Sequence, residues 1–478
     1  MRPYRAVAAL AAALVMTGLL GPVTAAPAGP RLRVIAATNH LDAMRYGDDW
    51  VYLDLGVYLA ALEAPLEIRV ARDSYRDPIE AWQVLNAGAT REIPTELLQG
   101  WWGFTDFAGV RIFRDGDPIR FVSLDWCPGS GDVQRIDDEG PRDPTYPALC
   151  WGSPFIRGHV FGVDQGWASA LAPGVPVRLG EGDYTARLRI RPAYRTLFDI
   201  APEDTSAELS ITVTSWDGGC LECSGAARID GSQGGRTRVT SAPTDTDPDP
   251  DTVPDLVALP AYGIYVENYR RHEWLTFGAN VWNAGPAPLV VEGFRQEGED
   301  LMDAFQYFTQ DGEVVGRAPV GGFEYDRHDD HQHWHFLQFA RYRLLDDTKE
   351  AIVRSRKQAF CLAPTDAIDL LRPNADWDPG SLGFSRCGGP ASLWIREVLQ
   401  VGWGDTYFQG LFGQGFEVTD LPNGTYYIEV TANPQGLLYE SGMKNNTRLR
   451  KVILRGDPGS RRVIVPAWNG IDTEGNRL

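Results

Sequence analysis

Short runs in which hydrophobic and polar residues alternate set the pattern of this chain. Every second side chain of a strand faces the same way, so residues 184–190 and 426–431 are predicted to be half-buried strands. Gly, Pro, Asn and Asp interrupt such runs at short intervals, as turns between strands do. Long helical periodicity is absent. One short helix is expected, at residues 365–372. The pattern therefore predicts an all-β fold of two tandem antiparallel β-sandwich domains.

Breaks in this pattern divide the chain. Residues 1–25 have the form of a signal peptide, because Arg2 and Arg5 precede an apolar run that ends before a small-residue cleavage pattern at 23–25. The acidic, Pro-rich segment 241–253 is expected to be an extended, solvated linker. The expected domains are therefore 26–240 and 254–456, with a C-terminal tail at 457–478. The protein is predicted to be secreted to the extracellular space.

The two expected domains share short motifs in the same order, which indicates an internal duplication. The matched pairs are 53–56 with 275–278, 102–108 with 334–340, 151–155 with 403–407, and 182–184 with 424–426. The chemically capable positions differ: Gln99, Trp101 and Gly103 stand opposite His331, His333 and His335, and Phe155 stands opposite Tyr407. The first copy is therefore expected to be a degenerate, non-catalytic repeat that covers or supports the second.

Charge and hydrophobicity argue against two classes of function, nucleic-acid binding and membrane spanning. The net charge of −19 provides no basic face for phosphates, which argues against nucleic acid and favours cationic partners such as amines or lysine-rich proteins. After the leader no stretch approaches ~20 apolar residues, so no membrane span is expected.

Six cysteines suit an oxidising compartment and could form three disulfides. Pairing neighbours is the simplest arrangement and gives Cys127–Cys150, Cys220–Cys223 and Cys361–Cys387. Cys220 and Cys223 could also form a redox or zinc pair, but no second Cys or His pair stands near them.

A histidine cluster is the main candidate for chemistry. His331, His333 and His335 alternate along one predicted strand, and His328 precedes them. Side chains at i and i+2 face the same way about 6.7 Å apart, so three imidazoles can converge on one metal. Imidazole suits copper, zinc, nickel or iron, and copper(II) binds most tightly in this series. A solvated polar strand is the alternative; His328 is either a supporting group or a surface residue.

Lys357 and Tyr407 mean little alone, since a surface lysine and a core tyrosine would explain them. With the histidines they form an ordered series of motifs that resembles the lysyl oxidases, the copper amine oxidases that build their own quinone cofactor. The resemblance covers most of the second half and lies in Pro254-Asp-Leu-Val257, His328-x-x-His331-Gln-His333-aromatic-His335, Lys357-x-x-Phe-Cys-Leu362, Asp405-Thr-Tyr407, Asp420-Leu-Pro-x-Gly424-x-Tyr426 and Glu440-Ser441 before Asn445-Asn446.

The resemblance implies a copper(II) site on His331, His333 and His335 and a lysine tyrosylquinone made from Lys357 and Tyr407. Such a cofactor deaminates primary amines, in peptidyl lysine or small molecules, with dioxygen as oxidant. The products are an aldehyde, ammonia and hydrogen peroxide. Asp405 is the candidate catalytic base, with a turn-capping role as the alternative. Animal members have a further histidine where Arg341 stands here, so no role of that histidine carries over.

The resemblance also implies a structural calcium ion. Asp255, the Leu256 carbonyl, Glu440, Asn445 and Asn446 match its ligand positions, and hard oxygen ligands suit calcium. Gly442 replaces an expected acidic residue, and the alternative is that Asn445 and Asn446 only form a turn.

Two other functions remain open from the sequence. The histidines alone would suffice for a copper-binding or matrix protein in which no quinone forms. The two sandwiches could also form a cell-surface scaffold. The sequence determines neither the substrate nor the oligomeric state.

Overall fold

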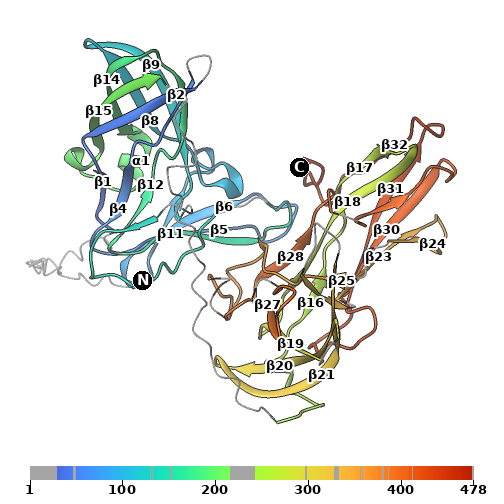
Figure 1. The fold of residues 1–478 in the computed structure, drawn as a ribbon. Coiled ribbons are helices and arrows are strands. Elements are labelled where there is room, and N and C mark those ends of the chain that lie inside the picture. Colours follow the sequence, from blue (N-terminus) through green and yellow to red (C-terminus); the bar gives the residue numbers. More distant parts are fainter. Residues whose placement is uncertain are drawn as a thin grey trace, which may run out of the picture.

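The computed structural model describes residues 29–475 apart from 47–49, 130, 132, 151–152, 216–242, 297–298, 328–332, 338, 356, 358, 379, 381, 386 and 412. The expected signal peptide lies outside the described residues. Strands dominate both halves, which confirms the all-β class (Figure 1). Among the residues described, no helix is long and apolar enough to cross a bilayer.

The first half contains three sheets. One has the order β1 (Leu32–Ala36), β4 (Val57–Ala61), β12 (Trp167–Ala170), β10 (Val133–Arg135). A second has the order β11 (Gly158–Val163), β5 (Leu66–Ala71), β6 (Glu80–Val84), β7 (Thr90–Ile93). The largest has the order β13 (Val175–Arg178), β3 (Trp50–Leu53), β2 (His40–Tyr46), β15 (Ser206–Ser215), β14 (Gly182–Ile190), β8 (Phe104–Arg114), β9 (Asp117–Trp126).

The second half also contains three sheets. One has the order β16 (Leu256–Ala258), β18 (His272–Asn283), β28 (Trp403–Tyr407), β26 (Asp366–Ala367), and β17 (Tyr262–Tyr269) and β29 (Gly415–Glu417) also pair with β18. Another has the order β25 (Ala359–Phe360), β22 (Trp334–Leu337), β21 (Glu313–Tyr325), β20 (Leu301–Gln310), β19 (Leu289–Arg295), β27 (Trp394–Leu399). The last has the order β24 (Ala351–Arg354), β23 (Ala340–Leu345), β30 (Gly424–Ala432), β31 (Thr447–Arg455), β32 (Arg462–Ile464).

Helical structure is short. In the described ranges α1 (Pro192–Leu197) is accompanied by 3-10 turns at Asn86–Gly88, Thr95–Leu97, Gly100–Trp102, Pro202–Asp204 and Pro250–Thr252. The helix expected at residues 365–372 is wrong, because Asp366 and Ala367 form a strand that pairs with Gly404 and Trp403. Sheet pairing outweighs the weak local helix propensity of these few residues. α1 was not predicted, although Pro192 at its first turn is a typical helix start.

Strand register in the two halves follows the same scheme. In the first half, Ala108 of β8 pairs with Ile190, eight residues after the start of β14. In the second half, Ala340 of β23 pairs with Ala432, eight residues after the start of β30. The third residue of each long strand is a tyrosine whose hydroxyl donates to the carbonyl four residues earlier, at 2.9 Å for Tyr184 and 2.6 Å for Tyr426. Two of the four matched pairs of motifs, 102–108 with 334–340 and 182–184 with 424–426, therefore occupy corresponding positions in paired strands.

The first half contacts the second through β11 and the loop before it. The Arg157 and Gly158 N–H groups donate to the Ile368 carbonyl, and the Leu370 N–H donates to the Gly158 carbonyl. Phe155 is fully buried in a cluster with Tyr262, Trp282 and Ile368 of the second half, and Figure 1 shows β5, β6 and β11 reaching toward that half. One hydrophobic cluster therefore belongs to both halves.

Phe155→Asp is expected to destabilise the full chain. A carboxylate in place of the Phe155 ring is expected to cost about 3–5 kcal/mol, because it is moved from water into a hydrophobic cluster. Thermal unfolding should show a clearly lower midpoint than in the parent. Phe121→Asp is the matched control, since Phe121 is exposed in the same half. Equal midpoints for both variants would show that this contact does not couple the halves.

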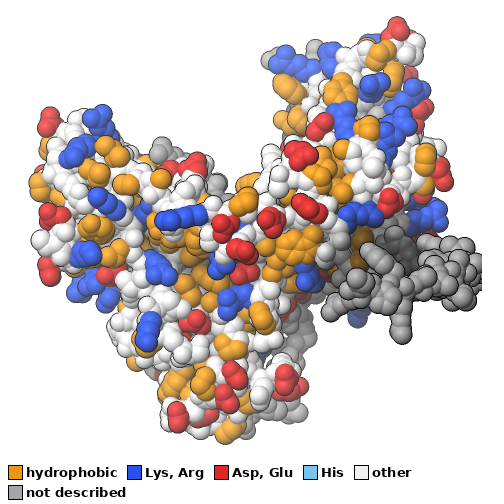
Figure 2. Space-filling view, turned by 180° about the vertical axis from the view of Figure 1, so that it is seen from behind, with side chains coloured by type: hydrophobic (Ala, Val, Ile, Leu, Met, Phe, Trp, Pro, Cys, Tyr) orange, Lys and Arg blue, Asp and Glu red, His pale blue; other side chains and the backbone are white. Residues whose placement is uncertain are grey.

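The segments expected to be a linker and a tail are packed in their described parts. The Arg317 N–H donates to the Pro243 carbonyl, and Val253 is buried against Phe308. Toward the C-terminus, β32 pairs with β31, and the Trp468 ring lies 5.5 Å from the Phe155 ring. Charges of both signs are interspersed over the face shown in Figure 2.

Candidate active site

The histidine cluster is described in part. His333 immediately precedes β22 and His335 lies within it, where it pairs with Glu324 of β21. The Nε2 atoms of His333 and His335 are 2.9 Å apart, and the two rings are inclined at 83°. His331 and His328 lie outside the described residues. Two ring nitrogens that converge on one point from the same strand face fit an imidazole metal site, and copper(II) suits such ligands.

Asp326 is a site residue that the sequence analysis did not single out. Its Oδ2 lies 3.7 Å from Nδ1 of His335, and its backbone N–H donates to the His333 carbonyl. Carboxylates behind the second ring nitrogen commonly orient metal-binding histidines. Its place only a few residues before the histidines was the signal available in the sequence.

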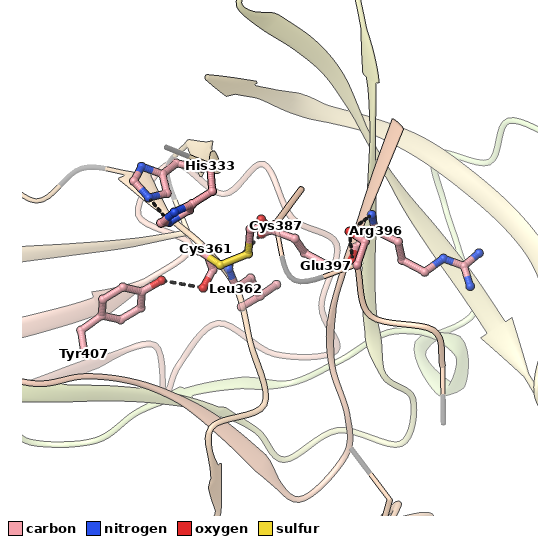
Figure 3. Close-up of a disulfide and its surroundings, with 9 residues drawn as sticks. His333, Cys361, Leu362, Cys387, Arg396, Glu397 and Tyr407 are labelled. Carbon is pink, nitrogen blue, oxygen red and sulfur yellow. Dashed lines mark hydrogen bonds between the residues drawn. A yellow bond between two sulfur atoms is a disulfide. The ribbon is translucent and has the colours of Figure 1, made fainter. Parts of the chain in front are cut away.

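Lys357 and Tyr407 come together in the structure. The Lys357 Nζ atom lies 4.8 Å from the centre of the Tyr407 ring, and each residue is only 7% exposed. Tyr407 ends β28, where it pairs with Ala279 of β18, and its ring packs edge-on against Phe360. The Tyr407 hydroxyl donates a 2.8 Å hydrogen bond to the Cys361 carbonyl (Figure 3). Residues 50 positions apart in sequence are thus adjacent.

Burial dominates the electrostatics of this pair. It lowers the pKa of Lys357, although the negative charges of Asp405 and Asp326 act in the opposite direction. Burial raises the pKa of Tyr407 well above its usual value, and Asp405 and Glu397 raise it further. Tyr407 is therefore a neutral phenol at neutral pH, beside a lysine whose uncharged amine is more accessible than in water.

Asp405 lies two residues before Tyr407 on β28, so both side chains project from the same strand face. Its carboxyl is 2% exposed, and burial raises its pKa well above the usual range. Within the described part of the chain its Oδ2 has no hydrogen-bond partner. A buried carboxyl of this kind takes up a proton far more readily than one in water.

Glu397 is a second buried carboxyl that the sequence analysis missed. Its Oε2 accepts a 2.9 Å hydrogen bond from the Leu362 N–H. One of its oxygens and the Cys361 and Cys387 sulfurs lie within 4.8 Å of one another, a grouping that geometry alone would allow as a metal site. The two sulfurs form a disulfide, however, and a metal would require their thiolates. This cluster is therefore structural.

The disulfides agree with pairing between neighbouring cysteines. Cys127–Cys150 and Cys361–Cys387 are both formed, which confirms those two predictions. Cys220 and Cys223 lie outside the described residues.

At one of the aligned positions the first half has no room for a side chain. Gly103 stands opposite His335 and has a φ of 96°, and a Cβ atom there would lie 2.3 Å from the Trp126 carbonyl oxygen. Backbone atoms cannot yield as a flexible side chain can, so a histidine does not fit. Phe155, opposite Tyr407, is buried in the cluster shared by the two halves.

The expected calcium ligands also lie together. Nδ2 of Asn445 donates to both oxygens of Asp255 at 2.9 and 3.0 Å. Glu440 accepts from Nδ2 of Asn446 at 2.8 Å and from the Leu256 N–H at 3.1 Å. In the described residues, Oδ1 of Asn445 and Oδ1 of Asn446 are buried without a hydrogen-bond partner. A hollow of about 460 Å³ opens beside them, lined by Asp255, Gly442 and Asn445 among others.

Two half-buried carboxylates form, with the two amide oxygens that have no partner among the described residues, a donor set that fits a hard cation. Burial raises the pKa of Glu440, and the nearby charge of Asp255 acts in the same direction. Gly442 leaves the hollow open, since a Cβ atom there would lie 3.8 Å from Asp255.

Arg341 lies beside a carboxylate. It lies on β23, 3.9 Å from Glu429, and burial lowers its pKa. The position aligned with the additional histidine of animal members therefore holds a cation beside a carboxylate.

Comparison with known proteins finds similarity to one family in the second half of the chain. Residues 306–462 match the family described as Lysyl oxidase. The protein-lysine 6-oxidase of Rattus norvegicus is 29% identical over 126 residues, which are 26% of this chain and 27% of that protein. The same enzyme of Sus scrofa is 29% identical over 126 residues, 26% of this chain and 45% of that protein.

Lysyl oxidase homolog 2 of Xenopus tropicalis is 26% identical over 207 residues, which are 41% of this chain and 24% of that protein. The chain therefore spans between about a quarter and a little under half of these relatives. The family match lies entirely within the second half of the chain.

Proposed function

The second half of this chain belongs to the lysyl oxidase family, and on that premise we propose that the protein is an exported copper- and quinone-dependent amine oxidase. It oxidises primary amines, either peptidyl lysine or small amines, to aldehydes and releases ammonia and hydrogen peroxide. Dioxygen is the co-substrate. The observation that carries the proposal is the 4.8 Å approach of the Lys357 amine to the Tyr407 ring.

Each site residue has a role that its surroundings support. His333 and His335, together with His331, would hold copper(II), and Lys357 and Tyr407 would provide lysine tyrosylquinone. When bound, copper and the quinone supply the redox chemistry and the carbonyl that captures the amine. Lys357 supplies a nucleophile, since its lowered pKa favours the free amine. The Cys361 carbonyl orients Tyr407 through its hydroxyl.

Asp405 is proposed as the base that removes the substrate α-proton. A general base works best when its pKa lies near the working pH, and burial moves the pKa of Asp405 upward from the range in which a carboxylate is a weak base. Its position on the same strand face as Tyr407 brings it to the reacting ring.

A second candidate function is copper binding without a quinone. The approach of the His333 and His335 Nε2 atoms favours it, because this geometry does not depend on Lys357. In that case Lys357 and Tyr407 would be core residues only.

The test is a visible spectrum of the copper-loaded, aerated full-length protein, followed by phenylhydrazine treatment and peptide mass mapping. The proposal expects a chromophore that forms a hydrazone and a peptide in which Lys357 is cross-linked to Tyr407. Bound copper with neither feature would reject the oxidase and leave the copper-binding protein.

We also propose calcium as a structural ion held by Asp255, the Leu256 carbonyl, Glu440, Asn445 and Asn446. Binding to the native state alone stabilises a protein by about 2.7 kcal/mol when the free ion is 100-fold above its Kd. Calcium should therefore raise the unfolding temperature of the parent by several degrees. Asn445→Ala should remove most of this rise, whereas Asn423→Ala, at an exposed asparagine, should keep it. A calcium response of the same size in the Asn445 variant would contradict the assignment.

A further inference from the structure

The peptide group that joins Cys361 to Leu362 is held from both sides. Its carbonyl accepts the Tyr407 hydroxyl at 2.8 Å, and its N–H donates to Oε2 of Glu397 at 2.9 Å. Figure 3 shows Glu397 and Tyr407 on opposite sides of this group, beside the Cys361–Cys387 disulfide. The Cys361 carbonyl, which accepts from Tyr407, therefore belongs to a peptide group that Glu397 holds from its other side.

The same unit is tied to the histidines. Cys387, the disulfide partner of Cys361, accepts a 2.9 Å hydrogen bond at its carbonyl from the Trp334 N–H. Trp334 stands between His333 and His335, and its own indole N–H donates to the Gly389 carbonyl at 3.0 Å. A short covalent and hydrogen-bonded path therefore joins the Tyr407 hydroxyl to the imidazole pair.

Glu397 is an unfavourable residue for its location. It is 0% exposed on β27, and its Oε1 has no hydrogen-bond partner among the described residues. A buried carboxyl with an unsatisfied oxygen destabilises a fold relative to an apolar side chain of similar volume. In the described part of the chain its other oxygen accepts from the Leu362 N–H, and that contact is the geometric reason for a carboxyl here.

We propose that Glu397 is a positioning residue of the oxidase site. By fixing the Leu362 N–H it holds the Cys361 carbonyl in the orientation that receives the Tyr407 hydroxyl, and so sets the Tyr407 ring against Lys357. Glu397 acts through this peptide group and does not contact the reacting atoms. This inference rests on the proposed oxidase function, since only a reaction at the Tyr407 ring requires the ring to be placed so closely.

Three substitutions in the full-length protein test the role. Glu397→Gln keeps an oxygen for the Leu362 N–H and cannot ionise. Glu397→Met removes that acceptor at similar volume, and Glu397→Asp shortens the reach by one methylene. Ile395→Met is the matched control, because Ile395 is 0% exposed two residues earlier on the same strand. Thermal unfolding shows which variants fold.

The first readout is the rate at which the chromophore appears after copper and dioxygen are supplied. We expect a loss of tenfold or more in Glu397→Met, a loss of threefold or more in Glu397→Asp, and near-parental rates in Glu397→Gln and Ile395→Met. If Glu397→Met does not fold, Glu397→Asp carries the test. Parental rates in the folded Met or Asp variant would overturn the proposal. A loss in Glu397→Gln as large as that in Glu397→Met would overturn it too, since charge and not position would then matter.

The second readout is hydrogen exchange at the Leu362 amide, measured by mass spectrometry of overlapping peptides without copper. It should be at least tenfold faster in Glu397→Met than in the parent and unchanged in Glu397→Gln. Unchanged exchange in Glu397→Met would overturn the positioning role. If the parent forms no chromophore, the oxidase function fails, and this readout still shows separately whether Glu397 holds the peptide.

Discussion

Tyr407→Phe is expected to abolish amine oxidation, by about 1,000-fold or more, while copper binding persists. The phenol oxygen is the atom that the proposed cofactor requires, and removal of an essential reacting group typically costs this much or more. The fold should tolerate the change, because phenylalanine keeps the ring that packs against Phe360 and loses only the hydroxyl that donates to the Cys361 carbonyl. Oxygen uptake with a primary amine, together with copper content after dialysis, measures both outcomes.

Tyr342→Phe is the matched control for this variant. Tyr342 is also buried, and its ring packs edge-on against the same Phe360 at 5.9 Å. Loss of its hydroxyl should leave the chromophore and the activity near parental levels. If Tyr407→Phe kept both the chromophore and the activity, Tyr407 would not be the cofactor precursor. If neither protein had a chromophore and both bound copper, the copper-binding alternative would stand.

His335→Ala is expected to lower copper affinity by about 100-fold or more and to prevent cofactor formation. Loss of groups that only support a metal ligand already costs about 10–100-fold, and a ligand itself should cost at least the upper figure. The Nε2 atom of His335 lies 2.9 Å from that of His333, so its removal takes away one of the proposed copper ligands. Competition with a chelator of known affinity gives the copper dissociation constant.

His272→Ala is the matched control, because it shows whether the loss of any histidine lowers copper affinity. His272 lies on β18 and is exposed, where its Nδ1 is 2.6 Å from Glu417. Its loss should leave copper affinity unchanged. Equal copper affinity in the parent and the His335 variant would remove His335 from the metal site.

The period-two pattern predicted strands because alternation is a local property of a chain that lies between core and solvent. β14 follows it closely: Tyr184, Ala186, Leu188 and Ile190 are buried, and the residues between them are exposed or half-buried. The helix predicted at 365–372 was wrong because a distant strand, and not a local pattern, decides the structure of this segment. Its few residues carry weak local preferences, and β28, about forty residues later, provides the strand with which it pairs.

The histidine pair was predictable from spacing, since residues i and i+2 of a strand share a face whatever the rest of the fold does. The pairing of Lys357 with Tyr407 was not, and only the family resemblance indicated it. Their approach requires β28 to lie beside β18 and β25 to lie beside β22, two separate sheet pairings. No periodicity within either segment contains that information.

The roles of Asp326 and Glu397 could not be predicted from the sequence either. As sequence, each is one acid among 64 Asp and Glu residues. Their roles come from what surrounds them: a histidine ring nitrogen 3.7 Å from Asp326, and a backbone N–H 2.9 Å from Glu397.

The sequence by itself predicted the all-β class, the alternating strand faces, two of the disulfides and the approach of His333 to His335. The strand faces and the histidine approach follow from residues a few positions apart, where backbone geometry fixes the distance, whereas the two disulfides were the simplest pairing of neighbouring cysteines. Tertiary structure alone decided the contact of Lys357 with Tyr407, the peptide bridge to Glu397 and the hydrophobic cluster shared by the two halves. Those contacts join segments tens to hundreds of residues apart, and their distances are set by sheet pairing and core packing, which no local pattern encodes.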